Sequence, residues 1–176
     1  MRNESKEIVD VSTGEIAVRK GLYILRAMAI GSCIVVAAFD SKTQNAGMAH
    51  IMLPGYAPQL SPGKSKYAAD GIGFMLSQMT QSGSILTDID FCLVGAGNVL
   101  RKDDDTICND NMNSVISIMR EKCIRAKASV LGGFKRKSVF LDTQTGRFSY
   151  TEGDEQEKPL WQSVLLTSNH PQRTEQ

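Results

Sequence analysis

Cys33 and His50 are the two residues of this sequence whose types and spacing suit nucleophilic catalysis. The chain has two histidines, and the other, His170, lies in a polar C-terminal stretch. A thiol becomes a strong nucleophile when a neighbouring base takes its proton. Any cysteine-based reaction is therefore predicted to use Cys33 as nucleophile and His50 as base. Packing is the plainer interpretation, because cysteine and a lone strand histidine usually occupy structural positions.

Three apolar segments around this pair are predicted to be strands that bring the two side chains together. They span residues 22–30, 34–39 and 46–53, and Gly31-Ser32 and Pro54-Gly55 interrupt the apolar pattern. The second and third segments are predicted to form an antiparallel hairpin, which would fold His50 back beside Cys33. Cys33 then lies at a corner, where the backbone amides of Ser32 and Cys33 are candidates for binding an oxyanion.

Two further segments have the periodicity of amphipathic helices. Ser65 is predicted to cap a helix that ends near Gly83, and Asp110 is predicted to cap a second one. Their inward faces are predicted to consist of Ala68, Ile72, Met75, Leu76 and Met79, and of Met112, Val115, Ile116, Met119 and Cys123. More strands are expected at 90–94, 128–131, 137–141 and 147–151. This order of elements is typical of an α+β layered domain.

Composition indicates one compact domain that works in a reducing compartment. The 176 residues carry a net charge of +1, which gives no reason to expect nucleic acid or an anionic membrane as partner. Cys33, Cys92, Cys108 and Cys123 form no Cys-x-x-Cys pair, and the three aspartates at 103–105 lack calcium-loop spacing. No metal site, signal peptide or membrane insertion is expected, and a cytoplasmic location is predicted.

Longer motifs around these residues resemble the chemoreceptor glutamine deamidase family, CheD. The stretch Ala29-Ile30-Gly31-Ser32-Cys33-Ile34-Val35-Val36, followed by Gly47-Met48-Ala49-His50-Ile51-Met52-Leu53-Pro54, is similar to the signature of that family. Weaker matches follow in the family's order at residues 62–68, 109–113, 131–133, 135–140 and 145–146. The resemblance covers about residues 14 to 151.

The resemblance implies a protein-glutamine deamidase that converts particular glutamines of methyl-accepting chemotaxis receptors to glutamate. It implies that Cys33 attacks, that His50 is the base, and that a thioester forms without a metal or organic cofactor. It also implies a CheC-type phosphatase as partner, and a mixed β-sandwich flanked by helices that is similar to toxin-type cysteine deamidases. The domain is expected to span residues 1–155, followed by a partly disordered tail at 156–176, with residues 169–176 disordered.

Ala27 departs from the family pattern. The family usually has a threonine six residues before the cysteine, where it orients the histidine as the third member of a triad, and this chain has Ala27 there. A methyl group accepts no hydrogen bond. A backbone carbonyl or another side chain is therefore expected to hold the His50 imidazole.

Functions of three classes remain open. The first is the active deamidase. The second is a catalytically weak or inactive regulatory protein that binds a CheC-type phosphatase or a receptor, with Ala27 marking the lost activity. The third is a hydrolase of free amides, which would need a deep small-molecule pocket. Conversion of receptor glutamines to glutamate, measured by mass, separates them.

Overall fold

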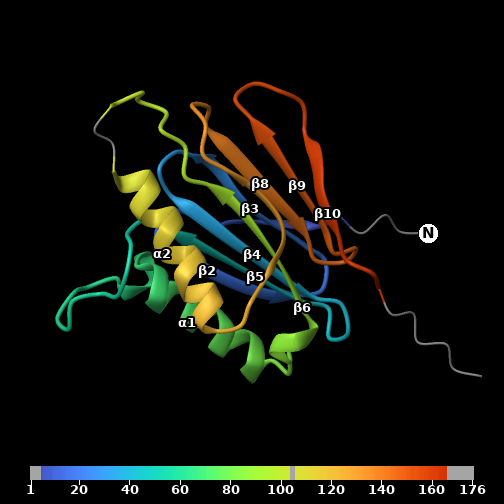
Figure 1. Ribbon diagram of the computed structural model, residues 1–176. Helices are drawn as coiled ribbons and strands as arrows, with labels where there is room; N and C mark the ends of the chain where they lie inside the picture. Colours follow the sequence, from blue (N-terminus) through green and yellow to red (C-terminus); the bar gives the residue numbers. More distant parts are fainter. Residues whose placement is uncertain (1–4, 104–105, 166–176) are drawn as a thin grey trace, which may run out of the picture.

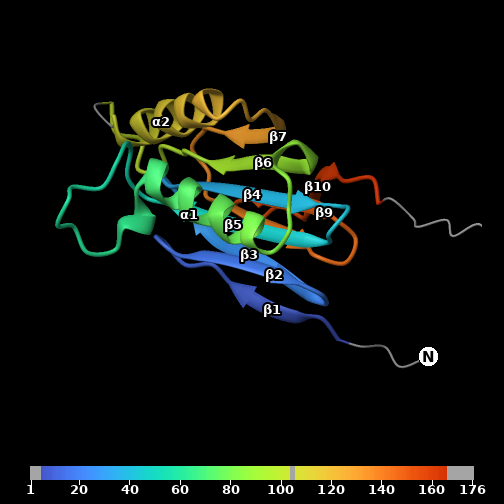
Figure 2. The same cartoon turned by 90° about the horizontal axis from the view of Figure 1, so that it is seen from below.

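The computed structural model describes residues 5–103 and 106–165. These residues form two five-stranded sheets and two α-helices, which stack as three layers (Figures 1 and 2). Both helices cover one face of the sheet in the middle, and the other sheet covers its opposite face. The predicted α+β class is confirmed.

The middle layer, here called the central sheet, has the strand order β2-β5-β4-β6-β7. The strands span Ile16–Lys20 (β2), Ile34–Asp40 (β4), Asn45–Ile51 (β5), Ile89–Gly95 (β6) and Ala126–Leu131 (β7). All neighbours are antiparallel except β6 and β7. β4 is buried along its whole length, because it has strands on both sides and apolar layers on both faces.

The second layer of strands, here called the outer sheet, has the order β1-β3-β8-β9-β10. The strands span Glu7–Asp10 (β1), Tyr23–Ile30 (β3), Lys137–Asp142 (β8), Arg147–Glu152 (β9) and Lys158–Gln162 (β10). β1 runs parallel to β3, and the other neighbours are antiparallel. β10 lies within the segment that the sequence assigned to the tail, and it pairs with β9.

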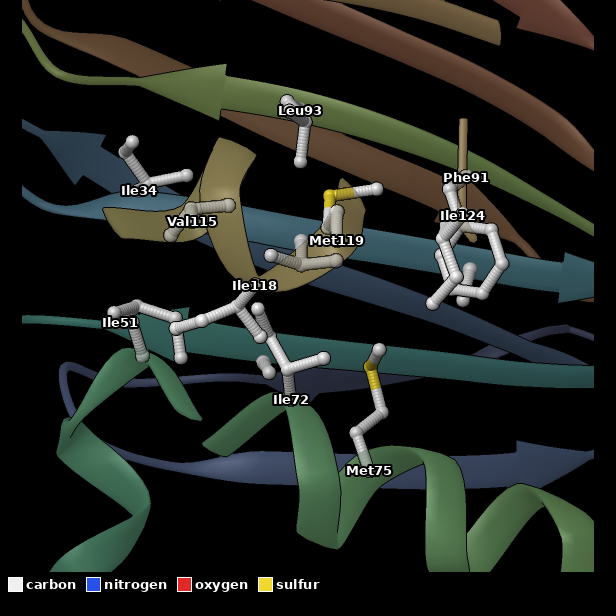
Figure 3. Packing of buried hydrophobic residues seen from close by; sticks show 14 of the residues in the cluster. Ile34, Ile51, Ile72, Met75, Phe91, Leu93, Val115, Ile118, Met119 and Ile124 are labelled. Atoms are coloured by element: carbon white, nitrogen blue, oxygen red, sulfur yellow. The ribbon is translucent and has the colours of Figure 1, made fainter. Parts of the chain in front are cut away.

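The helices α1 (Ala68–Gln81) and α2 (Ile107–Glu121) lie against the central sheet, and short 3-10 turns occur at η1 (Lys64–Lys66) and η2 (Leu86–Asp88). Figure 3 shows apolar side chains of both helices pointing toward those of the strands. The contacting residues include Ile72 and Met75 of α1, Val115, Ile118 and Met119 of α2, and Ile34, Ile51, Phe91 and Leu93 of the sheet. This burial holds α2 in place beside the start of β4.

The space between the two sheets contains a second apolar cluster, here called the inter-sheet core. Alternate residues of β4 (Val35, Ala37 and Phe39) contribute to it, as do Met48 of β5 and Ala27 of β3. Further members come from the outer sheet, among them Leu25, Val139, Leu141 and Phe148. Because side chains alternate along a strand, every second residue of β4 and β5 faces the outer sheet.

Both predicted helix caps are wrong. α1 begins after Tyr67, and the Ser65 hydroxyl donates to the Gly14 carbonyl (2.6 Å). α2 begins after Thr106, which places Asp110 inside its first turn. At α1 the chain reaches the helix through backbone hydrogen bonds of Lys66 and Ala68 with Met52 and Leu53, and these tertiary contacts override the local capping preference.

The predicted inward face of α2 is also partly wrong. Ile116 is more than one-third exposed, and Cys123 is exposed because the helix ends at Glu121. Ile118 takes the inward position that was expected of Ile116. The predicted tail disorder at residues 169–176 and two of the aspartates, Asp104 and Asp105, lie outside the described residues. Among the described helices, none has the length and apolarity needed to cross a membrane.

Candidate active site

The hairpin of β4 and β5 brings Cys33 and His50 to one face of the central sheet, as the sequence predicted. His50 is paired directly with Val35, and Cys33 comes two residues before Val35. Val35 faces the inter-sheet core, and Cys33 packs against the same core. Paired residues of an antiparallel ladder point to the same side, so the His50 imidazole also faces the outer sheet. Cys33 and His50 are therefore diagonal neighbours, a relation in which Cβ atoms lie roughly 7 Å apart or less.

Three consecutive carbonyls at the corner before β4 accept hydrogen bonds from the protein. The Gly31 carbonyl accepts from the Gly97 amide (2.8 Å) and the Cys33 carbonyl from the Ala96 amide (2.7 Å). The Ser32 carbonyl accepts from Asn111 Nδ2 (3.0 Å). In a trans peptide the N–H points opposite to the C=O, and no described peptide bond is cis. The amides of Ser32 and Cys33 therefore point away from Gly97 and Asn111.

Gly95 makes this close approach of backbones feasible. Its φ is +137°, a conformation that L side chains rarely adopt. A Cβ atom built there would lie 2.2 Å from the Cys33 carbonyl oxygen and 3.0 Å from Ile34 Cα. Any side chain at this position would therefore push the corner away from β6. The glycine sets the position of the nucleophile's backbone.

Asn111 ties the helix layer to both halves of the site. Its side chain is fully buried in the first turns of α2. The single nitrogen Nδ2 donates to the Ser32 carbonyl and to the Met52 carbonyl, both at 3.0 Å. Ser32 precedes Cys33 directly, and Met52 lies two residues after His50. The Asn111 side chain thus fixes the backbone just before Cys33 relative to the strand that carries His50.

His50 is held in one tautomer by the backbone of Val11. Imidazole Nδ1 lies 3.0 Å from the Val11 carbonyl, which can only accept, so Nδ1 carries the proton and Nε2 remains a base. Burial lowers the pKa of His50 from its usual value, against the opposing effects of the Val11 carbonyl and the Glu15 charge. The imidazole is therefore neutral at pH 7. The imidazole is thus held by a backbone carbonyl, one of the two kinds of group that the sequence left open.

Cys33 is half-buried, and burial raises the pKa of its thiol from the usual value. A hydrogen bond from the Thr13 side chain and one from the cysteine's own backbone act in the opposite direction. The free protein therefore carries a neutral thiol rather than a preformed thiolate. Ala27 is buried in the inter-sheet core and provides no hydroxyl.

A cavity of about 280 Å³ opens beside His50. It is lined by His50, by the segment from Asp10 to Thr13, and by Arg26 and Met28 of β3. A larger cavity of about 670 Å³ lies elsewhere, against β6, β7 and the end of α2, and contains neither Cys33 nor His50. The size of a cavity therefore does not indicate where the reactive residues lie. The lining of the smaller cavity includes His50 but not Cys33.

The other three cysteines do not take part in this arrangement. Cys92 is buried in the inter-sheet core, where burial raises the pKa of its thiol to about 12. Cys108 is buried in the first turn of α2, and Cys123 is exposed just after that helix ends. Within the described residues, no three Cys, His, Asp or Glu side chains gather in a way that could hold a metal ion.

The sequence reasoning named Cys33, His50 and the corner, but it missed the groups that hold them. Val11 lies in a stretch without a recognisable motif. Asn111 lies within the asparagine-bearing segment that carried part of the resemblance, although nothing in the sequence marked it as the bridging residue. The glycine-rich segment Gly95-Ala96-Gly97 could be recognised in the sequence, but the sequence did not indicate that it contacts the corner before β4.

Comparison with known proteins supplies the family. The sequence model described as CheD chemotactic sensory transduction matches residues 52–152. A relative from Chlorobium luteolum, named probable chemoreceptor glutamine deamidase CheD, is 35% identical over 171 residues, which cover 97% of this chain and 85% of the relative. This chain belongs to the CheD family.

Two other relatives also carry CheD names. A probable chemoreceptor glutamine deamidase CheD from Archaeoglobus fulgidus is 30% identical over 156 residues, covering 86% of this chain and 96% of the relative. The chemoreceptor glutamine deamidase CheD of Halalkalibacterium halodurans is 26% identical over 160 residues, which cover 88% of this chain and 99% of the relative. The CheD sequence model begins after His50, so it includes the supporting Asn111 and Gly95 but neither reactive side chain.

Proposed function

We propose that this protein deamidates specific glutamine side chains of methyl-accepting chemoreceptors, with Cys33 as nucleophile and His50 as general base. The observation that carries the proposal is the His50 ring, which Val11 holds with Nε2 as the base, on the sheet face that also bears Cys33. Membership of the CheD family and the names of the relatives support the substrate class.

In this proposal the thiol gives its proton to His50 Nε2 as sulfur attacks the carboxamide carbon of the glutamine. The new C–S bond pushes the carbonyl electron pair onto oxygen, which forms an oxyanion. When the oxyanion collapses, the C–N bond breaks and the imidazolium protonates the departing ammonia. Water, deprotonated by the neutral imidazole, then attacks the thioester; the C–S bond breaks and the imidazolium returns its proton to sulfur, which leaves glutamate and the free thiol.

The amides of Ser32 and Cys33 bind the oxyanion in this scheme. The fixed carbonyls of Gly31 and Ser32 support this role, because they direct the attached N–H groups away from the protein contacts on the other side. Such preorganised donors act on charge that develops only in the transition state. The neutral resting state of both side chains means that the thiolate forms during attack, with substrate in place.

The scheme uses neither a metal nor an organic cofactor. A cytoplasmic location fits a free thiol and substrates that are receptor cytoplasmic segments. We extend the proposal to a CheC-type phosphatase as partner and to a common origin of this sandwich with toxin-type cysteine deamidases. The family resemblance supports both.

The second candidate is a regulatory protein that binds a CheC-type phosphatase or a receptor with little or no catalysis. Ala27 in place of the family threonine and the raised pKa of the Cys33 thiol favour it. Incubation with receptors of the same organism separates the two candidates. Peptide mapping by mass is expected to find glutamine converted to glutamate at defined receptor positions. No conversion by protein with intact, reduced Cys33 would favour the regulatory candidate.

A further inference from the structure

Lys137, the first residue of β8, is a buried lysine that the reaction scheme does not use. It is 2% exposed. It lies on the same face of β8 as Val139 and Leu141, which belong to the inter-sheet core, so its side chain points into the space between the two sheets. A buried ammonium group is costly unless polar groups surround it. The groups that bind Lys137 therefore indicate what it does.

The Lys137 ammonium group has three acceptors. It donates to the Gly132 carbonyl and to the Lys135 carbonyl (3.5 Å), and Glu152 Oε1 of β9 lies 3.7 Å away. An ammonium group has three N–H donors, so each acceptor can take one. Both carbonyls belong to residues 132–136, here called the β7–β8 loop. Lys137 thus draws the beginning and the end of this loop together around one buried nitrogen.

The β7–β8 loop packs against the turn that follows β6. Two backbone hydrogen bonds, each 2.9 Å long, join the loop to this turn, from the Gly132 amide to the Gly95 carbonyl and from the Asn98 amide to the Gly133 carbonyl. A Cβ atom built at Gly97 would lie 3.1 Å from the Lys135 carbonyl oxygen. One of the carbonyls that binds Lys137 therefore also lies against the backbone of Gly97.

The turn in its place holds the corner before β4. The Gly97 amide donates to the Gly31 carbonyl (2.8 Å). The Gly31 carbonyl and the Ser32 amide belong to one peptide unit, so this bond sets the direction of the Ser32 N–H. A continuous path of hydrogen bonds and packed backbone therefore leads from Lys137, through the β7–β8 loop and the turn, to one of the two amides that face the oxyanion in the proposed function.

We propose that Lys137 is a positioning residue for the oxyanion site, acting through the β7–β8 loop on the Ser32 amide. It contacts no reacting atom and exchanges no proton with the substrate. Asn111 fixes the Cys33 amide from the helix layer, and Lys137 fixes the Ser32 amide from the outer sheet. This inference rests on the proposed function, in which both amides bind the oxyanion.

Lys137→Met tests this role, because methionine has a similar length but no donor. The Gly132 and Lys135 carbonyls then lose the group that holds them, and the loop is free to move away from the turn. Loss of a whole oxyanion donor costs roughly 10² to 10³ in turnover, so a donor that is only loosened should cost about threefold to tenfold in kcat. KM should stay within about twofold, because the oxyanion exists only in the transition state and intermediate.

Asn45→Ala is the control for a loss of stability without a loss of position. Its buried side chain donates to the Met79 carbonyl (3.1 Å) and to the Ser84 hydroxyl (2.9 Å). Asn45 pairs with Asp40, at the opposite end of the β4–β5 hairpin from the corner. Asn45→Ala should therefore lower the free energy of unfolding and leave kcat of the folded protein unchanged.

Hydrogen exchange measures the position of the turn without any receptor. The rate for the Gly97 amide is divided by the rate for Val36, a buried residue in the middle of β4 that reports on global unfolding. This ratio should rise by about tenfold or more in Lys137→Met and stay unchanged in Asn45→Ala. Should Lys137→Met not fold, Lys137→Gln replaces it. Glutamine keeps a donor on a shorter side chain, and about a threefold rise is expected.

A lower kcat with unchanged KM, together with faster relative exchange at Gly97, supports the role of Lys137. Either effect without the other overturns it, as does a Lys137 variant that behaves like Asn45→Ala. In all these cases deamidation that requires Cys33 leaves the proposed function standing. If Cys33→Ala deamidates as well as the wild type, the proposed function is wrong, and the assignment of Lys137 to an oxyanion site is wrong with it.

Discussion

Replacing Asn111 by alanine is expected to loosen the nucleophile corner without touching either reactive side chain. The buried amide nitrogen donates to the Ser32 and Met52 carbonyls, and both bonds disappear in Asn111→Ala. Each buried hydrogen bond contributes about 0.5 to 1.5 kcal/mol, so the loss is about 1 to 3 kcal/mol. The Asn111 Oδ1 atom has no hydrogen-bond partner among the described residues, and removing this unsatisfied acceptor offsets part of the cost. We expect a net destabilisation of about 1 to 2 kcal/mol.

The same change should reduce turnover more than it reduces receptor binding. The Ser32 carbonyl and the Cys33 amide belong to one peptide unit, so freeing the carbonyl lets the amide turn away from the oxyanion. Losing one oxyanion donor costs roughly 10² to 10³ in turnover, and a donor that is only loosened should cost about tenfold. An interaction made only in the transition state lowers kcat with little change in KM.

Asn113→Ala is the matched control, because Asn113 lies on the same helix but is exposed. Urea unfolding gives the free energies of unfolding, and receptor deamidation followed by mass gives the rates. Asn113→Ala should stay within about 0.5 kcal/mol of the parent in stability. If Asn111→Ala is as stable and as active as Asn113→Ala, the reasoning that α2 positions the nucleophile corner is refuted.

Two further predictions concern the backbone and the base. Gly95→Ala should destabilise the protein by more than Gly83→Ala and should remove most deamidation. Both glycines have positive φ (+137° and +95°), but only at Gly95 would an added Cβ atom meet the Cys33 carbonyl. Equal unfolding free energies for the two variants would contradict the close contact. In the pH profile of kcat/KM, His50 must be neutral to act as base, and burial lowers its pKa from 6.5, so activity should be lost only as pH falls through a midpoint below 6.5. A midpoint above 6.5 would show that the imidazole is not buried in this way.

The β4–β5 hairpin could be predicted from the sequence because its apolar segments are long and its boundaries are marked by glycine and proline. β4 is buried on both faces, so its continuous apolar pattern is strong. β1, β2 and β10 could not be predicted in the same way. Each is a short edge strand with few buried residues, and its backbone pairing leaves little trace in residue type.

The reactive residues could be predicted because their chemistry is rare in this chain, whereas their supports are common residues that act through the backbone. The orienting group for His50 is the carbonyl of Val11, which any residue possesses, so no sequence pattern could have named it. Asn111 binds the Ser32 carbonyl from 79 positions away in the chain, a separation at which only the folded structure shows the contact. The wrong cap at Ser65 has the same origin, since tertiary contacts of Lys66 and Ala68 decide where α1 begins.

The most direct test of the central claim compares the wild-type protein with Cys33→Ala and Cys92→Ala on receptors of the same organism. Cys92 lies in the inter-sheet core against which Cys33 packs, so the second variant controls for loss of a thiol at this core. Peptide mass should show glutamine converted to glutamate by the wild type and by Cys92→Ala, and no conversion by folded Cys33→Ala. Conversion by Cys33→Ala at the wild-type rate would contradict the account.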